Sequence, residues 1–232
     1  MTDLTVVMPV YNESEIIEGV INDWSNVLES LSLSYSIKVY NDGSSDNTFQ
    51  KLQEIETNYN NVHVIDKHNS GHGPTILRGY LENLQCQWLF QVDSDNEISA
   101  QHFIEFWSSR KNYDLLIGDR QNRNAGFLRG IVTFLSRMTV LVFYGNGIKD
   151  VNAPYRLMRS EKFKEIIQNI PNNTFAPNII ISGMAIKEKL AIKNIKVSNR
   201  PRLTGKGSIG KLKLLKVSLK SFYQTIQHAF RG

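Results

Sequence analysis

The stretch Trp88-Leu89-Phe90-Gln91-Val92-Asp93-Ser94-Asp95-Asn96-Glu97 is the segment from which the fold is best inferred. Its apolar, aromatic-rich start is typical of a buried β-strand. It ends in three acidic residues spaced by two, and because burying an unpaired charge is very costly, these are expected at the strand's end. There they can converge on a hard divalent cation such as Mg²⁺ or Mn²⁺, which takes oxygen ligands and leaves room for substrate phosphates. The alternative is a polar loop in which Asp95 or Asn96 is a turn residue or helix cap.

Length and composition are those of a globular chain. The 232 residues suit one substantial domain, with 41% hydrophobic and 21% charged residues. The single cysteine, Cys86, excludes an internal disulfide and fits a reducing compartment. No secretory signal is expected, because the first residues lead directly into a strand. The apolar segment 131–148 is at the lower limit for a membrane span and contains Arg137, so we expect a cytoplasmic protein that does not cross a membrane.

The charge is distributed unevenly along the chain. Of its 27 Lys and Arg residues, 12 lie from Lys187 onward, with one of the 22 acidic residues. This end has a net charge of +11, and the first 186 residues have −6. A basic tail on a slightly acidic body indicates a polyanionic partner, and nucleic acid, anionic lipid and phosphorylated small molecules all qualify.

Apolar runs and helical patterns alternate through the first half of the chain. Strands are expected at 5–10, 37–40, 62–65, 88–92 and 113–117, and helices at 14–31, 46–59, 74–84 and 100–110. Ser14 is expected to be the N-cap of the first helix, and Pro74 to lie in the first turn of the third. Regular alternation of this kind predicts an α/β fold with a mostly parallel sheet flanked by helices.

Polar clusters follow three of these strands. They are Tyr11-Asn12-Glu13, the segment 41–46, and Asp93-Ser94-Asp95. In open α/β sheets, ligands bind outside the carboxyl ends of the strands. Polar residues that serve only to form turns explain one such cluster well, but they explain three clusters at one edge less well. The pattern therefore favours a nucleotide–metal site at this edge.

Three motifs together resemble family 2 glycosyltransferases with the GT-A fold. They are Val7-Met8-Pro9-Val10-Tyr11-Asn12-Glu13, Asn41-Asp42-Gly43-Ser44-Ser45-Asp46-Asn47-Thr48 and Asp93-Ser94-Asp95. The later half is similar to the polyprenyl-phosphate branch, typified by dolichyl-phosphate mannosyltransferases, through Asp150-Val151-Asn152-Ala153-Pro154-Tyr155-Arg156 and, more loosely, Arg202-Leu203-Thr204-Gly205. The resemblance implies a Rossmann-like GT-A domain over residues 1–207, followed by a basic amphipathic helix over 208–232.

The resemblance also implies roles by position. Nucleotide-binding residues would be Pro9, Tyr11, Glu13, Asp42, Asp93, Ser94 and Arg120, and metal ligands Asp93, Asp95 and Glu97, with Glu97 standing where the branch often has Gln. The catalytic residues would be Asp93, Asp95, Arg156 and Arg202. Arg120, Arg156 and Arg202 would neutralise the donor diphosphate or an acceptor phosphate, since Arg presents a fork of donors that matches phosphate oxygens. The alternatives are a surface salt bridge for Arg156 and solvated charges for the other two.

The chain departs from the family pattern at several positions. Asn41 replaces the first Asp of the usual D-D-G-S motif, and Pro154 stands where the branch favours Gly. Ser208 comes one residue late and is followed by Ile209 rather than Lys. Asn178 stands where related enzymes often have Glu. Acceptor specificity is the part of the resemblance that these changes affect most.

Two further segments have two interpretations each. Gly71-His72-Gly73 can offer backbone N–H groups to an anion, but a tight strand–helix connection is favoured, and His72 is assigned no chemistry. In the tail, Leu212, Leu215, Leu219, Phe222 and Ile226 share one helical face beside Lys213, Lys216 and Lys220. That helix packs on the domain or lies against anionic lipid, and the apolar segment 127–144 would add to such a surface.

The resemblance implies an inverting, Mg²⁺- or Mn²⁺-dependent transfer of a sugar from a nucleotide diphosphate. The acceptor would be a polyprenyl phosphate or a surface-glycan intermediate of polysaccharide biosynthesis, and the protein would be peripheral on the inner face of the membrane. One alternative, a sugar nucleotidyltransferase, is disfavoured because the N-terminal Gly-rich phosphate loop is missing. The other, a non-catalytic polyanion-binding protein, is disfavoured because no aromatic residues interleave with the basic tail, and no nucleic acid partner is expected.

Overall fold

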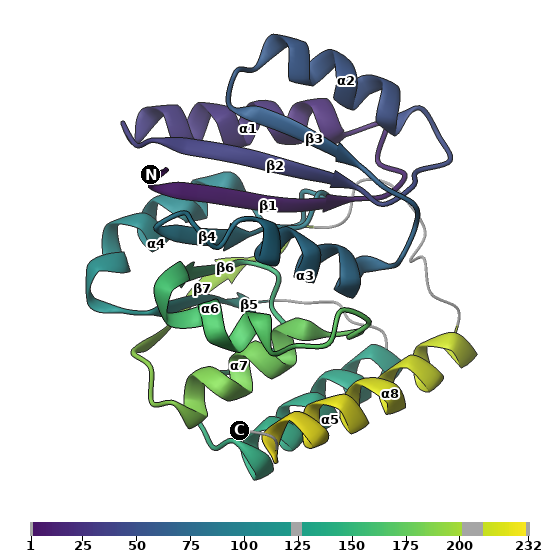
Figure 1. Ribbon diagram of the computed structural model, residues 1–232, viewed down its shortest axis with the longest axis vertical. Coiled ribbons are helices and arrows are strands. Elements are labelled where there is room, and N and C mark those ends of the chain that lie inside the picture. The colour runs from purple at the N-terminus through teal and green to yellow at the C-terminus, as the bar shows by residue number, and fades with distance from the viewer. Residues whose placement is uncertain (1, 122–126, 201–210, 231–232) are drawn as a thin grey trace.

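The computed structural model describes residues 2–121, 127–200 and 211–230. Seven strands form one sheet in the order β3-β2-β1-β4-β6-β5-β7 (Figure 1). In chain order the elements are β1 (Leu4–Val10), α1 (Ile17–Ser30), β2 (Tyr35–Asn41), α2 (Thr48–Asn58), β3 (Val62–Asp66), α3 (His72–Glu82), β4 (Trp88–Gln91), η1 (Ala100–His102), α4 (Phe103–Ser109), η2 (Arg110–Asn112), β5 (Leu115–Gln121), α5 (Phe127–Phe143), β6 (Arg156–Arg159), α6 (Ser160–Gln168), α7 (Pro177–Lys187), β7 (Ile192–Ser198) and α8 (Lys211–Ala229).

The sheet is parallel except at β6, which is antiparallel to both of its neighbours, β4 and β5. The carboxyl ends of β1, β2, β3, β4, β5 and β7 therefore meet at one edge. This confirms the predicted mostly parallel α/β sheet. The antiparallel direction of β6 was not predicted, because strand direction depends on how the chain returns to the sheet.

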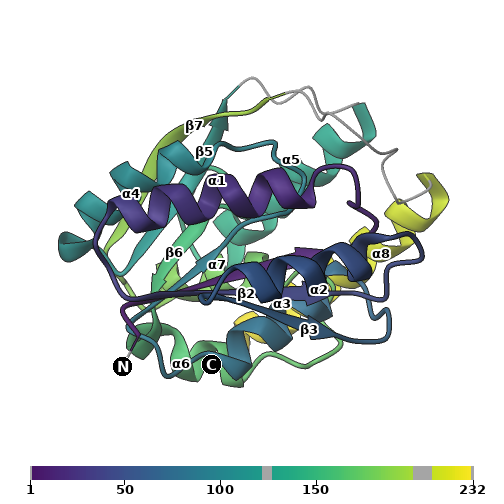
Figure 2. The same cartoon turned by 90° about the horizontal axis from the view of Figure 1, so that it is seen from above.

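Helices cover both faces of the sheet (Figure 2). Alternate residues of β1 enter two different cores: Val6 and Met8 pack with α1, α2 and α4, whereas Val7 packs with α3, α6 and α7. This is the period of two expected of a strand that is buried on both faces. In the first core, Phe90 of β4 lies between the rings of Trp24 and Phe103. Both cores thus anchor the strands that lead to the carboxyl edge.

Helix starts differ from the expectations. The first helix begins at Ile17, and its cap residue, Ile16, makes no side-chain cap hydrogen bond, so the predicted Ser14 cap is wrong. The Ser14 backbone N–H instead donates to Asp46 Oδ2 at 3.3 Å. The predicted helix 100–110 is split into η1, α4 and η2. Across the described residues, no helix combines the length and the apolar character needed to cross a bilayer.

Candidate active site

The three predicted polar clusters do converge at the carboxyl edge. Val10 of β1 pairs with Asn41 of β2, and Asn41 pairs with Asp66 of β3, so three strands end side by side. Beside them β4 ends at Gln91, two residues before Asp93. A ligand at this edge would meet loops from all four strands, as expected for a doubly wound sheet.

The loop after β1 is tied to the loop after β2. The backbone N–H of Asn12 donates to Ser44 Oγ at 3.0 Å, and the N–H of Ser45 donates to Asn12 Oδ1 at 2.8 Å. Asn12 has a φ of 55°, a left-handed conformation that Asn tolerates better than most residues. Pro9 and Glu13 are buried, whereas Tyr11 remains 41% exposed. The fixed loop thus leaves the Tyr11 ring accessible to a ligand.

Asp42 is buried and organises the chain that leads into α3. Its carboxylate accepts hydrogen bonds from the backbone N–H groups of Ser70 (2.8 Å) and Gly71 (2.9 Å) and forms an ion pair with Lys67. These contacts use both carboxylate oxygens. In this geometry Asp42 shapes the carboxyl edge by holding the β3–α3 loop in place.

Asp93 is held by two side chains on one oxygen. His72 Nε2 lies 2.9 Å from Asp93 Oδ1, and Gln91 Nε2 donates to the same oxygen at 3.3 Å. Burial raises the pKa of Asp93, but His72 and Arg120 outweigh it and the pKa lies below its ordinary value. Desolvation lowers the pKa of His72, but Asp93, Asp95 and Asp42 outweigh that and raise it. The pair therefore favours the ionised form of Asp93 and the protonated form of His72.

Asp95, Glu97 and Asp93 line one small cavity together with Arg120. Asp95 Oδ1 accepts the backbone N–H of Glu97 at 3.2 Å, so the turn chemistry considered above does operate here. Glu97 Oε2 accepts from Asn199 Nδ2 at 3.3 Å, beyond the end of β7. Ser94, between the two aspartates, is buried.

The carboxylates do not make a ready-made metal cage. Among the described residues, no three His, Cys, Asp or Glu side chains come close enough together to hold an ion. The expected trio of Asp93, Asp95 and Glu97 is therefore not preassembled. Two carboxylates on one cavity still fit Mg²⁺ or Mn²⁺, because Mg²⁺ usually binds through one or two carboxylates and completes its shell with water and substrate phosphates.

Arg120 is paired within the protein. Its Nε and Nη2 donate to the two oxygens of Asp150 at 2.6 and 3.2 Å, and its side chain is 8% exposed. Asp150 opens the segment that resembles the polyprenyl-phosphate branch, so the structure gives that residue a definite partner. The guanidinium lines the cavity of Asp93 and Asp95 and adds positive charge there.

Arg156 is fully buried, and it makes no surface salt bridge. Its guanidinium donates to the carbonyls of Ala153 (2.9 Å), Asn178 (3.1 Å) and Val151 (3.2 Å). Burial lowers the pKa of Arg156 to about 10. Contact with a diphosphate, as the resemblance implies, would require breaking these bonds. Its visible role is to fix the backbone at the start of α7.

A buried amide network links α7 to Asp93. Asn178 Nδ2 donates to Gln91 Oε1 at 2.7 Å, and the hydroxyl of Tyr80 donates to the same oxygen at 2.6 Å. Gln91 in turn donates to Asp93. Asn178 is 3% exposed and orients Asp93 through Gln91.

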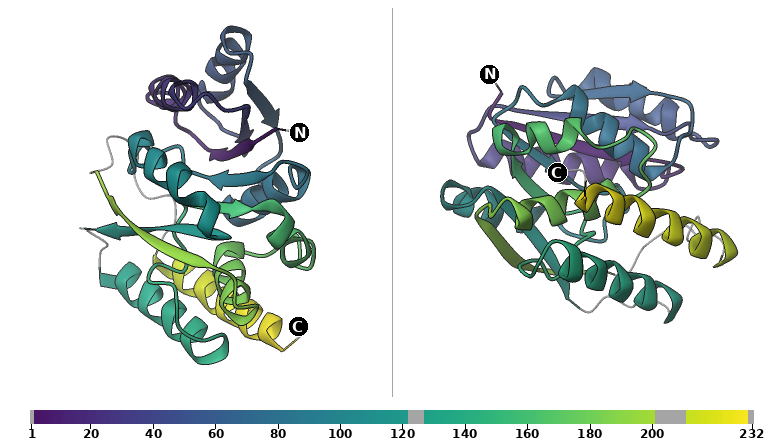
Figure 3. Two further views of the ribbon diagram at one scale, coloured as in Figure 1. Left: turned by 90° about the vertical axis from the view of Figure 1, so that its left-hand side faces the viewer. Right: turned by 60° about the horizontal axis from the view of Figure 1, so that its bottom comes forward.

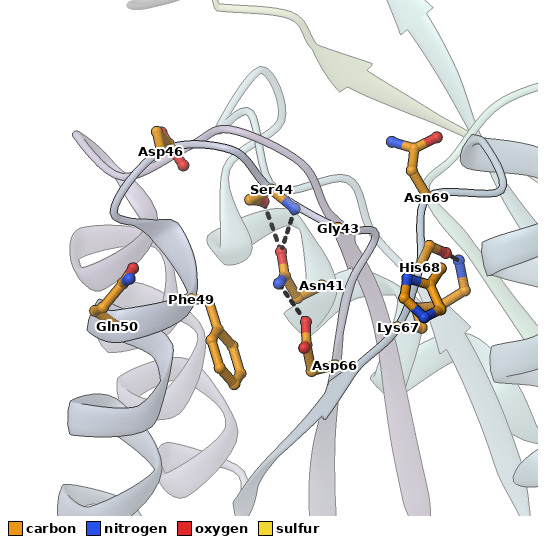
Figure 4. A pocket seen from close by; sticks show the side chains of 10 residues that line it. All are labelled: Asn41, Gly43, Ser44, Asp46, Phe49, Gln50, Asp66, Lys67, His68 and Asn69. Atoms are coloured by element: carbon orange, nitrogen blue, oxygen red, sulfur yellow. Dashed lines mark hydrogen bonds between the residues drawn. The ribbon is translucent and has the colours of Figure 1, made fainter.

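A cavity of about 470 Å³ lies beside the ends of β2 and β3 (Figure 4). Asn41 Nδ2 donates to Asp66 Oδ1 at 2.6 Å, and Asn41 Oδ1 accepts from the backbone N–H and the hydroxyl of Ser44. Phe49 of α2 supplies an apolar wall. Gly43 has a φ of 67°, and an added Cβ would lie 2.8 Å from Asn69 N, so the loop over this cavity requires glycine.

Sequence reasoning missed His72, Gln91 and Asp66 as site residues. Asp66 ends β3 at the shared edge, and His72 follows at the start of α3. Their position at this edge is the signal that would have identified them. Arg202 and its motif, residues 202–205, lie outside the described residues. The proposed domain boundary at 207 falls there as well.

The chain was compared with models of known protein families and with individual relatives. The model of glycosyl transferase family 2 matches residues 5–167, more than two thirds of the chain. The chain belongs to this family. The dolichyl-phosphate beta-glucosyltransferase ALG5D of Trichomonas vaginalis is 22% identical over 214 residues, which are 84% of this chain and 64% of the relative. The uncharacterised glycosyltransferase YkcC of Bacillus subtilis is 25% identical over 226 residues, 93% of this chain and 66% of the relative. This family 2 chain thus spans about two thirds of the length of these relatives.

Solved structures match the same GT-A fold. Glucosyl-3-phosphoglycerate synthase of Mycobacterium tuberculosis, solved with Mn²⁺, UDP-glucose and phosphoglyceric acid, has a TM-score of 0.71 at 15% identity, over 99% of this chain and 80% of its own. TarS (1–349) of S. aureus has a TM-score of 0.56 at 17% identity, over 83% of this chain and 58% of its own. At these identities, the likeness establishes the fold of the family 2 chain and leaves its substrates to be proposed.

Proposed function

We propose that the protein transfers a sugar, with inversion, from a nucleoside diphosphate sugar to a phosphate-bearing acceptor such as a polyprenyl phosphate. The observation that carries this is the placement of Asp93 and Asp95 on one cavity at the carboxyl edge of a family 2 chain. Family membership favours transfer over the nucleotidyltransferase and polyanion-binding alternatives. The dolichyl-phosphate relatives support a lipid-phosphate acceptor, and with it a role in glycan assembly.

The nucleotide is proposed to lie across the ends of β1, β2 and β3. The exposed Tyr11 ring offers a stacking face, and the cavity of Asn41, Phe49 and Asp66 is large enough for a base. Loss of the Asp66 carboxylate by Asp66→Ala should raise the nucleotide Kd roughly tenfold, the equivalent of about one charge-assisted hydrogen bond. Asp23→Ala, on the exposed side of α1, is the matched control. Equal affinity of both variants would move the base elsewhere.

The diphosphate is proposed to lie over Asp93 and Asp95. These two residues would hold a Mg²⁺ or Mn²⁺ ion, whose chemistry is to neutralise negative charge on the departing diphosphate. His72 and Gln91 both contact Asp93 Oδ1, and the second oxygen, Oδ2, is the one proposed to face the ion. Arg120, fixed by Asp150, adds positive charge to the same cavity.

Direct attack explains the proposed inversion and the phosphate acceptor together. An acceptor phosphate oxygen would form a bond to the anomeric carbon as the bond from that carbon to the donor diphosphate breaks. The attacking oxygen is already anionic, so no proton needs to be removed. Asn178 is consistent with this, because its buried amide is engaged with Gln91 and cannot serve as a base.

A pair of acceptors tests the proposal. A polyprenyl phosphate and the corresponding polyprenol differ by the phosphate alone. Release of nucleoside diphosphate from a panel of nucleotide sugars should require Mn²⁺ or Mg²⁺ and should occur with the phosphate and not with the alcohol. Transfer to the alcohol would overturn the assignment of the acceptor. Release that persists in EDTA would overturn the role of the metal.

A further inference from the structure

The outward face of α5 is apolar. Besides Phe143 at its end, five of its side chains are between 37% and 68% exposed, namely Phe134, Leu135, Met138, Leu141 and Val142. Their spacing places them on one side of the helix. The opposite side is buried and includes Ser136, Val140 and Tyr144. A surface helix normally buries its apolar side and exposes its polar side. These five residues, called the α5 face below, therefore require a partner.

Helix α5 lies beside α8 at one end of the molecule (Figures 1 and 3). The hydroxyl of Tyr144, which follows α5, donates to the carbonyl of Thr225 at 2.7 Å, and the rings of Phe143 and Phe230 lie 5.9 Å apart. In the sequence, α5 follows β5 and α8 follows β7, two strands that end at the carboxyl edge. The pair of helices is thus connected to the same edge as Asp93 and Asp95.

The two helices carry basic residues and no acidic ones. Helix α5 contains Arg129 and Arg137 and no Asp or Glu. Helix α8 contains four Lys residues and no Asp or Glu. Among these, Arg137 of α5 and Lys220 of α8 are exposed. An apolar face flanked by cationic residues complements a surface that is apolar within and anionic outside.

We propose that the α5 face docks on an anionic lipid bilayer, with its aromatic and aliphatic side chains at the acyl boundary and the basic residues of α5 and α8 at the head groups. The sequence had suggested α8 as the lipid-facing helix. In the described part of α8, however, Ser221, Thr225 and His228 are buried against the domain. Among the described residues, the largest group of exposed apolar side chains lies on α5, next to Tyr223 of α8 and Phe230 after it, which are 63% and 77% exposed.

A second copy of the chain fits this surface less well. A two-fold interface places the same residues opposite themselves, so cationic segments would face cationic segments. Like charges facing each other across an interface oppose association. An anionic bilayer removes that conflict. The docking stands apart from catalysis, but its use in presenting a lipid phosphate to the site rests on the proposed function.

Vesicle co-sedimentation of the full chain tests the docking. The protein should pellet with phosphatidylcholine vesicles that contain phosphatidylglycerol, and high salt should release much of it. The double variant Phe134→Ser/Val142→Ser should lower the partition coefficient roughly tenfold or more, since it removes the two most exposed side chains of the face. Ile104→Ser, which changes a 41% exposed residue on α4, should bind as the wild type does. Thermal melts check that all variants are folded.

Three results would overturn the docking. They are equal binding by the double variant, an equal loss in Ile104→Ser, and a dimer that the double variant abolishes without any vesicle binding. Nucleotide-sugar binding is measured in parallel without vesicles, by thermal shift, and should be the same in the double variant and the wild type. Vesicle binding without any donor binding would leave the docking intact and refute the proposed function. Donor turnover on a short-chain, water-soluble acceptor phosphate without vesicle binding would support the proposed function and refute the docking.

Discussion

His72 Nε2 lies 2.9 Å from Asp93 Oδ1, so the first residue of α3 contacts the carboxylate that follows β4. The side chains are 56% and 28% exposed, and the contact stands at the point where the diphosphate is proposed to bind. Glycines flank His72: Gly71 has a φ of 91°, and a Cβ added to Gly73 would lie 1.9 Å from the carbonyl oxygen of Phe175, so both positions require glycine. A segment that reads as a simple strand–helix connection thereby supplies an imidazole to the site.

The His72–Asp93 pair should make stability depend on pH in a defined window. The pKa of His72 is raised, so its contribution is complete below about pH 6.5, the value for unfolded His, and is lost as the pH rises through the folded value. The pKa of Asp93 is lowered, so its contribution is present above about pH 4 and is lost as the pH falls through the folded value. The difference in Tm between the wild type and His72→Ala should be largest near about pH 6 and smaller near about pH 9.

Thermal melts across that range check this prediction. His68→Ala changes an exposed histidine of the same loop and serves as control, with a small difference expected at every pH. A difference between wild type and His72→Ala that stays constant from acid to alkaline pH would show that the pair has no ionic character.

Asn178→Asp should destabilise the fold. The amide Nδ2 that donates to Gln91 Oε1 would become an oxygen, and an ionised carboxylate would be buried. The expected loss in the free energy of unfolding is about 2–4 kcal/mol at neutral pH. Burial raises the pKa of such a carboxyl, so the loss should shrink in acid, where a protonated Asp donates again. Urea denaturation at two pH values measures this, and Asn172→Asp on an exposed loop is the control. Unchanged stability would disprove the buried network.

Arg156→Met separates a structural role from a phosphate contact. Three carbonyls would lose a buried donor, so the free energy of unfolding should fall by about 3 kcal/mol. The nucleotide Kd of the folded fraction should stay within about twofold of wild type, a difference of under half a kcal/mol. Arg159→Met, which removes a partly exposed pair with Asp114, should cost about 1 kcal/mol or less. Normal stability with weakened binding would instead support the diphosphate contact that the family resemblance implies.

The carboxyl edge could be predicted from the sequence because its signals are local. The apolar run before Asp93 and the turn residues around Gly43 each specify a strand end, and strand–helix alternation specifies that these ends share an edge. Helix boundaries were less predictable: Ser14 has the chemistry of a cap, yet its backbone is bound to Asp46 from another loop.

The partners of individual side chains could not be predicted because they come from distant segments. The strand that contains Arg156 could be predicted from the sequence. The burial of Arg156, however, depends on the start of α7, which provides the Asn178 carbonyl. His72 meets Asp93 because α3 begins beside β4. The segment 127–144 could be named from the sequence as part of a lipid-facing surface, but only the structure shows which of its sides is covered. Such contacts depend on tertiary packing, which local pattern does not encode.

The most direct test of the account compares wild type with Asp95→Asn in the release of nucleoside diphosphate from nucleotide sugars, with a polyprenyl phosphate acceptor and Mn²⁺ present. Asp95→Asn removes a charge with little change in volume, so the variant should keep the Tm of the wild type. Turnover should fall about a hundredfold or more, the equivalent of at least about 3 kcal/mol of transition-state stabilisation. A folded variant with wild-type turnover, or a wild type that releases no nucleoside diphosphate from any donor, would contradict the account.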